Sequence, residues 1–205
     1  MANKKILAYS NYWIRKHIQD EYVKKSYQNK IRSRSWFKLD SIQKTDKILK
    51  PGIIVFDLGS SPGGWSQYAS YILKETGRII AFDLLPMKPI HNVDFFQGKI
   101  SIKKIKKIIN QKKIDLIMSD MCPNITGIAS TDDINILYLG RLALKICYYF
   151  LDQKGIFVVK TFHGKEFNKY LNEISKLFKK INIRKPNASR STSSEVYIVA
   201  KIKKI

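Results

Sequence analysis

Residues 53–67 read IIVFDLGSSPGGWSQ, an apolar, β-branched run that leads through a glycine-rich turn into a second apolar segment. The run from Ile53 to Leu58 has the length and composition of a buried strand. The turn at residues 59–64 is followed by a predicted helix from Trp65 to about Lys74. In α/β proteins such a turn lies at the carboxyl end of the first strand, where glycines let the backbone approach a ligand closely.

The rest of the chain continues this alternation of strands and helices. Short apolar runs predict strands at residues 78–82, 93–96, 114–118, 155–160, 182–184 and 196–200. Helices are predicted at residues 102–109, 134–151 and 167–178. In the first of these helices the lysines face away from the isoleucines and are expected to form a solvated face: Lys103, Lys104, Lys106 and Lys107. The alternation predicts a Rossmann-like α/β fold, a mainly parallel sheet with helices on both faces.

Length and charge narrow the class of protein. The chain has 205 residues, 44% of them hydrophobic, and a formal net charge of +22. The length favours one domain, and the hydrophobic content is that of a globular chain. A surface of this charge attracts polyanions such as nucleic acid. Lysine supplies 31 of the 38 cationic residues. Four of the seven arginines lie beside sequence motifs and are better binding candidates than the average lysine: Arg32, Arg34, Arg184 and Arg190.

The composition argues against a membrane or secreted protein. The longest apolar run, residues 146–151, is far shorter than the roughly 20 residues of a membrane span. The first seventeen residues lack the apolar stretch of a secretory signal. Cys122 and Cys147 form no CxxC unit, and the histidines are scattered. We expect a cytoplasmic protein with no membrane contact, disulfide or metal site, and like-charge repulsion favours a monomer.

The amino-terminal stretch differs in composition from the rest of the chain. Residues 1–38 contain ten Lys or Arg and seven aromatic residues, with only two acidic residues. Such a stretch can be a solvated arm, but aromatic rings among cations suit RNA, because phosphates bind the charges and unstacked bases bind the rings. We therefore expect residues 1–34 to form a basic RNA-binding extension and residues 35–205 to form the main domain.

The first turn and the second strand together predict a nucleoside ligand. The turn lacks the GxGxxG spacing of a pyrophosphate cradle, and Pro62 lies inside it. The second strand ends at Asp83, 24 residues after Gly59, where a carboxylate can accept hydrogen bonds from ribose hydroxyls. This combination favours S-adenosylmethionine over NAD, and it makes an NAD-dependent oxidoreductase a poor alternative.

Six strings in the chain closely resemble the FtsJ-type ribosomal RNA 2′-O-methyltransferases. They are DLGxxPGGWSQ from residue 57, DLLPM from 83, SDMxPN from 119, VKTF from 159, RKPxxSR from 184 and SEVYIVA from 194. The resemblance covers almost the whole chain. It implies a sheet with an antiparallel last strand, S-adenosylmethionine as methyl donor, and a Lys-Asp-Lys-Glu catalytic set that falls on Lys38, Asp120, Lys160 and Glu195.

The resemblance also implies a substrate and a cofactor site. The substrate is the ribose of a uridine in large-subunit (23S) ribosomal RNA, methylated on the large ribosomal subunit or a late precursor. The residues expected around the cofactor are Gly59, Gly63 and Trp65 through the backbone, Asp83 at the ribose and Asp120 at the methionine amine. Lys99 occupies the position near the adenine where the family usually has an acid, so we expect a weakened cofactor complex.

Two questions about activity stay open at the level of sequence. Lys160 can act as a general base if burial and Lys38 lower its pKa, or as a charged amine that orients the attacking oxygen. The second question is whether Lys99 has turned the chain into a basic ribosome-assembly protein that binds RNA with weakened methyl transfer. The complete Lys38, Asp120, Lys160 and Glu195 set argues for the enzyme.

Overall fold

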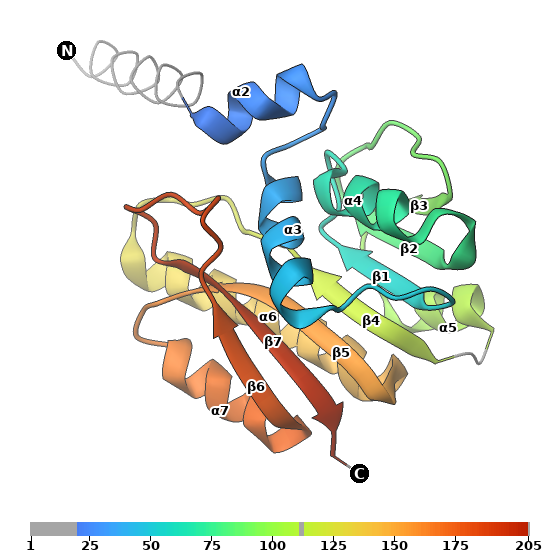
Figure 1. Cartoon of the computed structure of the whole chain (residues 1–205). Coiled ribbons are helices and arrows are strands. Elements are labelled where there is room, and N and C mark those ends of the chain that lie inside the picture. The colour runs from blue at the N-terminus through green and yellow to red at the C-terminus, as the bar shows by residue number, and fades with distance from the viewer. Residues whose placement is uncertain (1–19, 111–112, 205) are drawn as a thin grey trace.

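The computed structural model describes residues 20–110 and 113–204. Seven strands form one sheet in the order β3-β2-β1-β4-β5-β7-β6 (Figure 1). Neighbours from β3 to β5 are parallel, whereas β7 is antiparallel to both β5 and β6. The strands are β1 Ile54–Leu58, β2 Arg78–Asp83, β3 Val93–Gln97, β4 Ile114–Ser119, β5 Leu151–Phe162, β6 Phe178–Arg184 and β7 Glu195–Lys203. The predicted Rossmann-like sheet is confirmed, with its antiparallel last strand.

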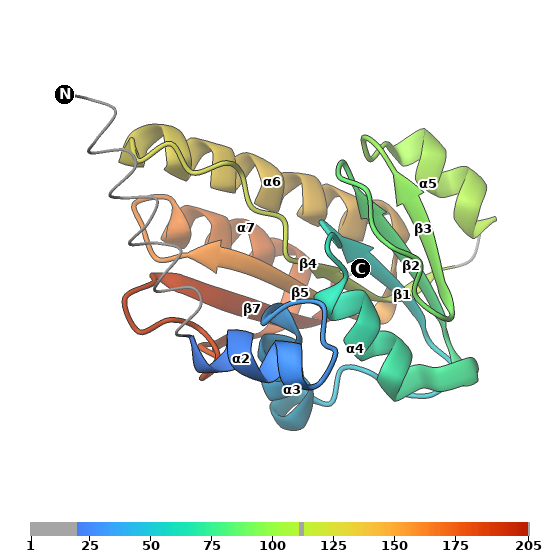
Figure 2. The same cartoon turned by 90° about the horizontal axis from the view of Figure 1, so that it is seen from above.

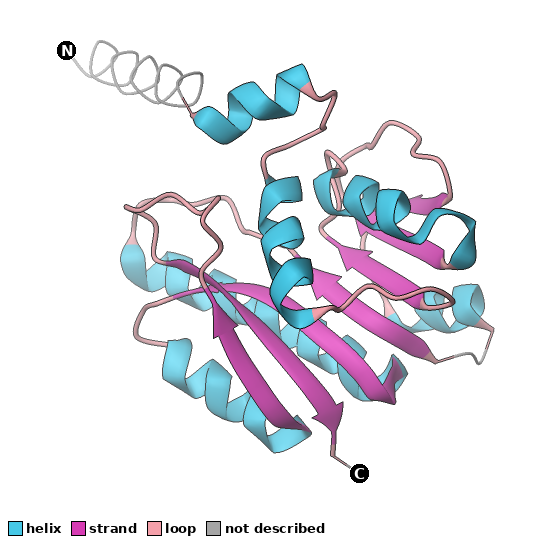
Figure 3. Ribbon diagram, viewed as in Figure 1, coloured by secondary structure: helices cyan, strands magenta, loops and turns pink. Residues whose placement is uncertain are grey.

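Helices cover both faces of the sheet, as Figures 2 and 3 show. They are α2 Glu21–Gln28, α3 Ser35–Asp46, α4 Gly64–Leu73, α5 Ile102–Ile109, α6 Ala129–Phe150 and α7 Phe167–Leu177. Leu39 of α3 and Trp65 of α4 pack with Tyr197 in the core on one face. Ile105 of α5 and Tyr170 of α7 belong to the core on the other. Each face therefore buries an apolar layer, which removes large aliphatic and aromatic side chains from water.

Helix α6 begins five residues before its predicted start at residue 134, at Ala129. Asp132, in its first turn, accepts hydrogen bonds from the backbone N–H groups of Thr126 and Gly127, at 2.8 and 3.0 Å. This carboxylate fixes the loop before the helix and satisfies two backbone donors. In the described part of the chain, no helix combines the length and apolar character that a membrane span requires.

Asp20 attaches the amino-terminal helix α2 to the main domain. Its carboxylate accepts from the N–H of Tyr22 at 3.0 Å, which caps the helix, and pairs with Arg34. Arg34 also donates to the carbonyl of Ala188, and Arg190 lies 3.6 Å from Asp20. One carboxylate thus connects α2 to the loop between β6 and β7. Residues 1–19 of the predicted extension lie outside the described residues.

The four arginines favoured as RNA contacts have partners within the protein. Arg32 donates to the carbonyls of Lys88 and Pro89, both at 2.5 Å. Arg184 binds the buried carboxylate of Asp46 at 2.7 Å, which joins β6 to the end of α3. Together with Arg34 and Arg190 they connect segments that are distant in sequence. Their guanidinium groups therefore have a structural function that sequence reasoning did not foresee.

Candidate functional site

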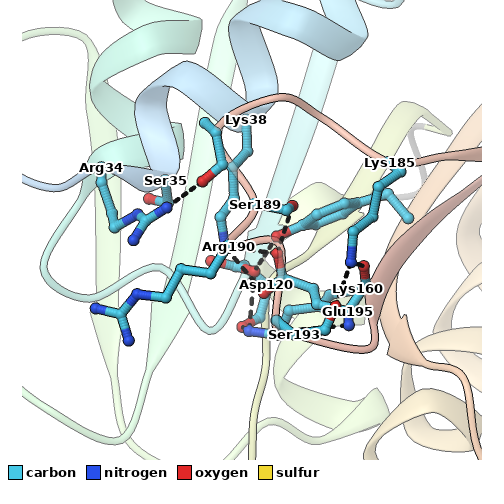
Figure 4. Close-up of polar contacts among 12 residues, drawn as sticks. Arg34, Ser35, Lys38, Asp120, Lys160, Lys185, Ser189, Arg190, Ser193 and Glu195 are labelled. Atoms are coloured by element: carbon cyan, nitrogen blue, oxygen red, sulfur yellow. Dashed lines mark hydrogen bonds and ion pairs between the residues drawn. The ribbon is translucent and has the colours of Figure 1, made fainter. Parts of the chain in front are cut away.

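Four elements bring the predicted catalytic residues to one edge of the sheet. Asp120 follows the last residue of β4, Lys160 lies near the end of β5, and Glu195 begins β7. Because β7 is antiparallel, its first residue reaches the same edge as the last residues of the parallel strands. Lys38 comes from the beginning of α3, which packs on one face of the sheet. Figure 4 shows the four side chains in one cluster, as the resemblance implied.

The four side chains form two ion pairs. Lys160 Nζ lies 2.9 Å from Asp120 Oδ1, and Lys38 Nζ lies 2.7 Å from Glu195 Oε1. The side chain of Lys160 is only 8% exposed and that of Lys38 12%. Buried ammonium groups require such partners, because an unpaired buried charge is strongly destabilising.

Tyr197 and Ser189 connect and orient the two pairs. The Tyr197 hydroxyl donates to Asp120 Oδ1 at 3.3 Å, and Lys38 Nζ lies 5.8 Å from the centre of the Tyr197 ring. The Ser189 hydroxyl donates to Glu195 Oε1 at 2.9 Å. Neither residue was among the predicted site residues. Tyr197 is two positions after Glu195 on β7, so strand periodicity could have indicated that both side chains share a face.

The charges of the cluster shift the pKa values of its members. Burial lowers the pKa of Lys160, but Asp120, together with contributions from Cys122 and Glu195, more than offsets this effect, so the pKa lies above the ordinary lysine value. Burial raises the pKa of Glu195, and the Lys38 ammonium reverses this, so the net shift is downward. Both groups are therefore charged at neutral pH.

A cavity of about 170 Å³ lies beside the cluster, against the glycine-rich turn. Gly59, Trp65 and Asp120 are among its lining residues, together with serines 33, 35, 60 and 61. Gly59 has a φ of +77°, and a Cβ there would lie 2.7 Å from Met121 Cγ. A larger residue would clash at the wall of the cavity, which explains the glycine.

The remaining predicted cofactor residues lie around this cavity but not in its lining. Asp83 Oδ2 accepts from the Ser61 N–H at 2.8 Å, which leaves further lone pairs for a ligand. Gly63 has a φ of +110° and is the N-cap residue that precedes α4. Lys99 is exposed, two residues beyond the end of β3 and next to Gly98, whose N–H donates to the Asp83 carbonyl at 2.7 Å.

Two buried polar atoms at the base of the glycine-rich turn have no hydrogen-bond partner, Asp57 Oδ1 and Ser60 Oγ. Burial raises the pKa of Asp57 to about 7, although Ser66 donates to its other oxygen at 2.5 Å. Polar atoms left unpaired in this way are uncommon and often belong to a site that a ligand completes. The carboxylates of Asp57 and Asp83, and the unpaired Ser60 hydroxyl, suit a ligand that carries cationic groups.

A mostly parallel sheet with an antiparallel β7, and a cavity at the carboxyl ends of its strands, define a Rossmann-like methyltransferase. A model of the FtsJ-like methyltransferase family matches residues 31–203, and the chain belongs to this family. Membership confirms the predicted cofactor, S-adenosylmethionine. The glycine cradle, the unpaired acceptors and the carboxylate of Asp83 fit this cofactor, whose sulfonium and amine are cationic.

Solved structures of other methyltransferases are similar to this chain. A Plasmodium falciparum protein described as a ribosomal RNA methyltransferase is 29% identical, with a TM-score of 0.75 over 84% of this chain and 98% of that one. An rRNA-methylase from Clostridium thermocellum is 17% identical, with a TM-score of 0.53 over 80% and 97%. Human methyltransferase-like protein 13, in complex with SAH, is 11% identical, with a TM-score of 0.58 over 81% and 79%. The last two show a shared fold.

Proposed function

We propose that this methyltransferase transfers a methyl group to the ribose 2′-hydroxyl of a uridine in large-subunit (23S) ribosomal RNA, on the ribosomal particle. The observation that carries the proposal is the convergence of Lys38, Asp120, Lys160 and Glu195 beside the cavity. The likeness to a ribosomal RNA methyltransferase at 29% identity supports RNA as the substrate. The net charge of +22 supports a polyanionic partner.

In this proposal Lys160 orients the attacking oxygen. When bound, S-adenosylmethionine supplies a methyl group that its sulfonium already activates. Two of the three Lys160 N–H groups bind Asp120, one at the main-chain oxygen and one at the carboxylate. The third N–H is available to the substrate oxygen, and it fixes the direction of the oxygen lone pair. A protonated amine cannot accept the hydroxyl proton, so that proton leaves late, to solvent.

Lys38 and Glu195 act one step away from the reacting oxygen. Lys38 adds positive potential that stabilises charge as it develops on the oxygen. Glu195 holds Lys38 through contacts of 2.7 and 2.9 Å from its two carboxylate oxygens. Residues 1–34, which include α2, are proposed to contact the RNA backbone, and the enzyme is proposed to work as a cytoplasmic monomer.

Transfer of radiolabelled methyl groups to large ribosomal subunits that lack the modification tests this function. Wild type is expected to label the subunit, and the Lys160→Ala variant to lose about 10²–10⁴-fold in rate while it binds cofactor normally. Lys179→Ala, an exposed lysine on β6, is the matched control. Mass spectrometry of the digested RNA should give a 2′-O-methyluridine; a base-methylated nucleoside would contradict the proposed reaction.

One observation favours a second candidate, an RNA-binding assembly factor with weakened methyl transfer. Lys99 lies beyond β3 where the family usually has an acid, and an ammonium cannot accept a hydrogen bond from the adenine amine. The same assay separates the candidates. Tight binding to the subunit without labelling, equal in wild type and Lys160→Ala, would favour the assembly factor.

A further inference from the structure

The carboxyl-terminal part of α6 borders two large cavities at the sheet edge opposite the catalytic cluster. One, of about 500 Å³, lies between α6 and α7, and the other, of about 490 Å³, lies between α6 and α5. Tyr149 lines both. We call the pair of cavities the α6 groove. Figure 2 shows α5, α6 and α7 together on one face of the sheet.

The α6 groove is strongly basic. Five lysines line it: Lys106, Lys107, Lys113, Lys145 and Lys176. Glu173 is the one acid among the lining residues that the structure describes, and Arg141 already binds it, Nε to Oε2, at 2.9 Å. Among the described residues, none of the five lysines lies within ion-pair distance of an acid. A neighbouring lysine, Lys203, has its pKa lowered by burial and then by the charge of Lys113. Glu173 offsets part of the charge of Arg141 and Lys176, and the groove keeps a large excess of positive charge.

Two exposed aromatic rings lie at the junction of the cavities. Tyr148 is 62% exposed and Tyr149 45%, and their ring centres are 5.2 Å apart. Lys203 fixes the position of Tyr148. Its Nζ donates to the Tyr148 carbonyl at 2.7 Å and lies 5.7 Å from the centre of the Tyr148 ring. Exposed tyrosine faces beside lysines are the combination that binds unpaired nucleotides, rings to bases and ammonium groups to phosphates.

We infer that the α6 groove binds an unpaired segment of ribosomal RNA, remote from the methylated nucleotide, with a base on Tyr149 and phosphates on the lysines. This inference rests on the proposed function, which makes ribosomal RNA the substrate. A protein partner fits less well, because protein interfaces are depleted in lysine. The lysines of α5 that sequence analysis assigns to a solvated face, Lys106 and Lys107, thereby become part of a binding surface.

The position of the groove makes the inference testable by RNA length. β4 alone, Ile114–Ser119, separates the two edges of the sheet by about 20 Å. A short oligonucleotide that fills the catalytic site leaves the groove empty, whereas a folded large-subunit RNA can contact both. Methylation of long RNA should therefore depend on the groove, and methylation of a short substrate should not.

The test compares two triple variants of equal charge. The groove variant carries Lys106→Gln, Lys107→Gln and Lys113→Gln, and the control carries Lys50→Gln, Lys179→Gln and Lys180→Gln, all at exposed positions. Fluorescence anisotropy measures affinity for a folded large-subunit transcript and for a short oligonucleotide at several salt concentrations. We expect the groove variant alone to weaken transcript binding by about tenfold or more and to reduce the salt slope by about 2. Equal effects of the two variants on the transcript would overturn the inference.

Two variants of Tyr149 distinguish base stacking on the tyrosine ring from phosphate binding by the lysines: Tyr149→Ala and Tyr149→Phe. We expect the alanine variant to weaken transcript binding several-fold with an unchanged salt slope, and the phenylalanine variant to restore it. A loss of affinity for intact subunits, with normal affinity for the naked transcript, would identify a protein occupant and overturn the inference. If wild type labels no subunit, the proposed function fails; if wild type labels subunits and the groove variant binds and labels them equally well, only the groove inference fails.

Discussion

Lys160 donates two hydrogen bonds to a single residue, Asp120, at 2.6 Å to the main-chain oxygen and 2.9 Å to the carboxylate. The pair joins the ends of β4 and β5 at the point where the proposed function places the reacting oxygen. Burial opposes the charge on Lys160, yet the Asp120 carboxylate raises the pKa above the ordinary lysine value. The amine is thus held in its charged form and in one orientation.

Methyl transfer should depend little on pH near neutrality. Because the pKa of Lys160 is raised from about 10.4, its charged form persists throughout the range from about pH 7 to pH 9. The single-turnover rate should therefore be nearly flat over this range. A general base with such a raised pKa would instead give a rate that rises about tenfold per pH unit. A rise of that slope in wild type, absent from Lys160→Arg, would contradict the role of a steering cation.

The Glu195→Gln variant should lose much less activity than Lys160→Ala. Gln has nearly the same shape and can still accept a hydrogen bond from Ser189, but it loses the charge that holds Lys38. Because Glu195 acts through Lys38, we expect kcat to fall about tenfold or less, against about 100-fold or more for Lys160→Ala. KM for RNA should change little. A loss in the glutamine variant equal to that in Lys160→Ala would place Glu195 at the reacting atoms.

Lys99→Asp should tighten cofactor binding. Lys99 is exposed beside the strand end that carries Asp83, and a carboxylate there can accept from the adenine amine. The gain of one hydrogen bond is worth about 0.5–1.5 kcal/mol, or up to about tenfold in affinity by calorimetry. Lys103→Asp, on the exposed face of α5, makes the same charge change and is the control. Equal tightening in both variants would assign the effect to net charge.

Asp57 should make the protein less stable as pH rises. Burial raises its pKa to about 7, with smaller contributions from Asp120 and Asp83, whereas an unfolded chain has about 3.9. Between these values the folded carboxyl retains a proton that the unfolded chain has lost, so the free energy of unfolding falls as pH rises. We expect a decrease of about 1–3 kcal/mol between roughly pH 5 and pH 7.5 in urea denaturation without cofactor.

Asp57→Asn provides the control for this pH dependence, because an amide cannot titrate and keeps an acceptor for Ser66. Its stability should vary less over the same range. Four described acids have lowered pKa values: Asp46, Asp132, Glu173 and Glu195. They lose their stabilising contributions only as pH falls below about 4, so they do not contribute in this window. Identical pH profiles for wild type and Asp57→Asn would exclude the buried carboxyl as the source.

The sheet was predictable because its central strands are buried on both sides. Most residues of β1 and β4 are buried and apolar, which a sequence shows as apolar runs. The edge strand β6 was predicted only from residue 182, whereas it begins at Phe178. Its exposed Lys179 and Lys180 interrupt the apolar pattern, since an edge strand needs no burial there.

The proposed catalytic set could be located only through the family resemblance. Lys38 and Glu195 are 157 positions apart, and no periodicity connects them. Other contacts depend on the path of the loop between β6 and β7. They are the hydrogen bonds of Ser189 and Tyr197 to the cluster and the ion pair between Arg34 and Asp20. Such loop paths follow from tertiary packing, which local patterns of charge and apolarity do not encode.

The insertion of β7 between β5 and β6 determines when the charged cluster can be completed. Glu195 and Tyr197 both lie on this strand, and it is the last strand of the sheet to be synthesised. A nascent chain that has already completed the glycine-rich turn and its cavity wall still lacks Glu195, the partner of Lys38, and Tyr197, which donates to Asp120. Full activity is therefore expected only after residues 195–203 have emerged from the translating ribosome and paired with both neighbours.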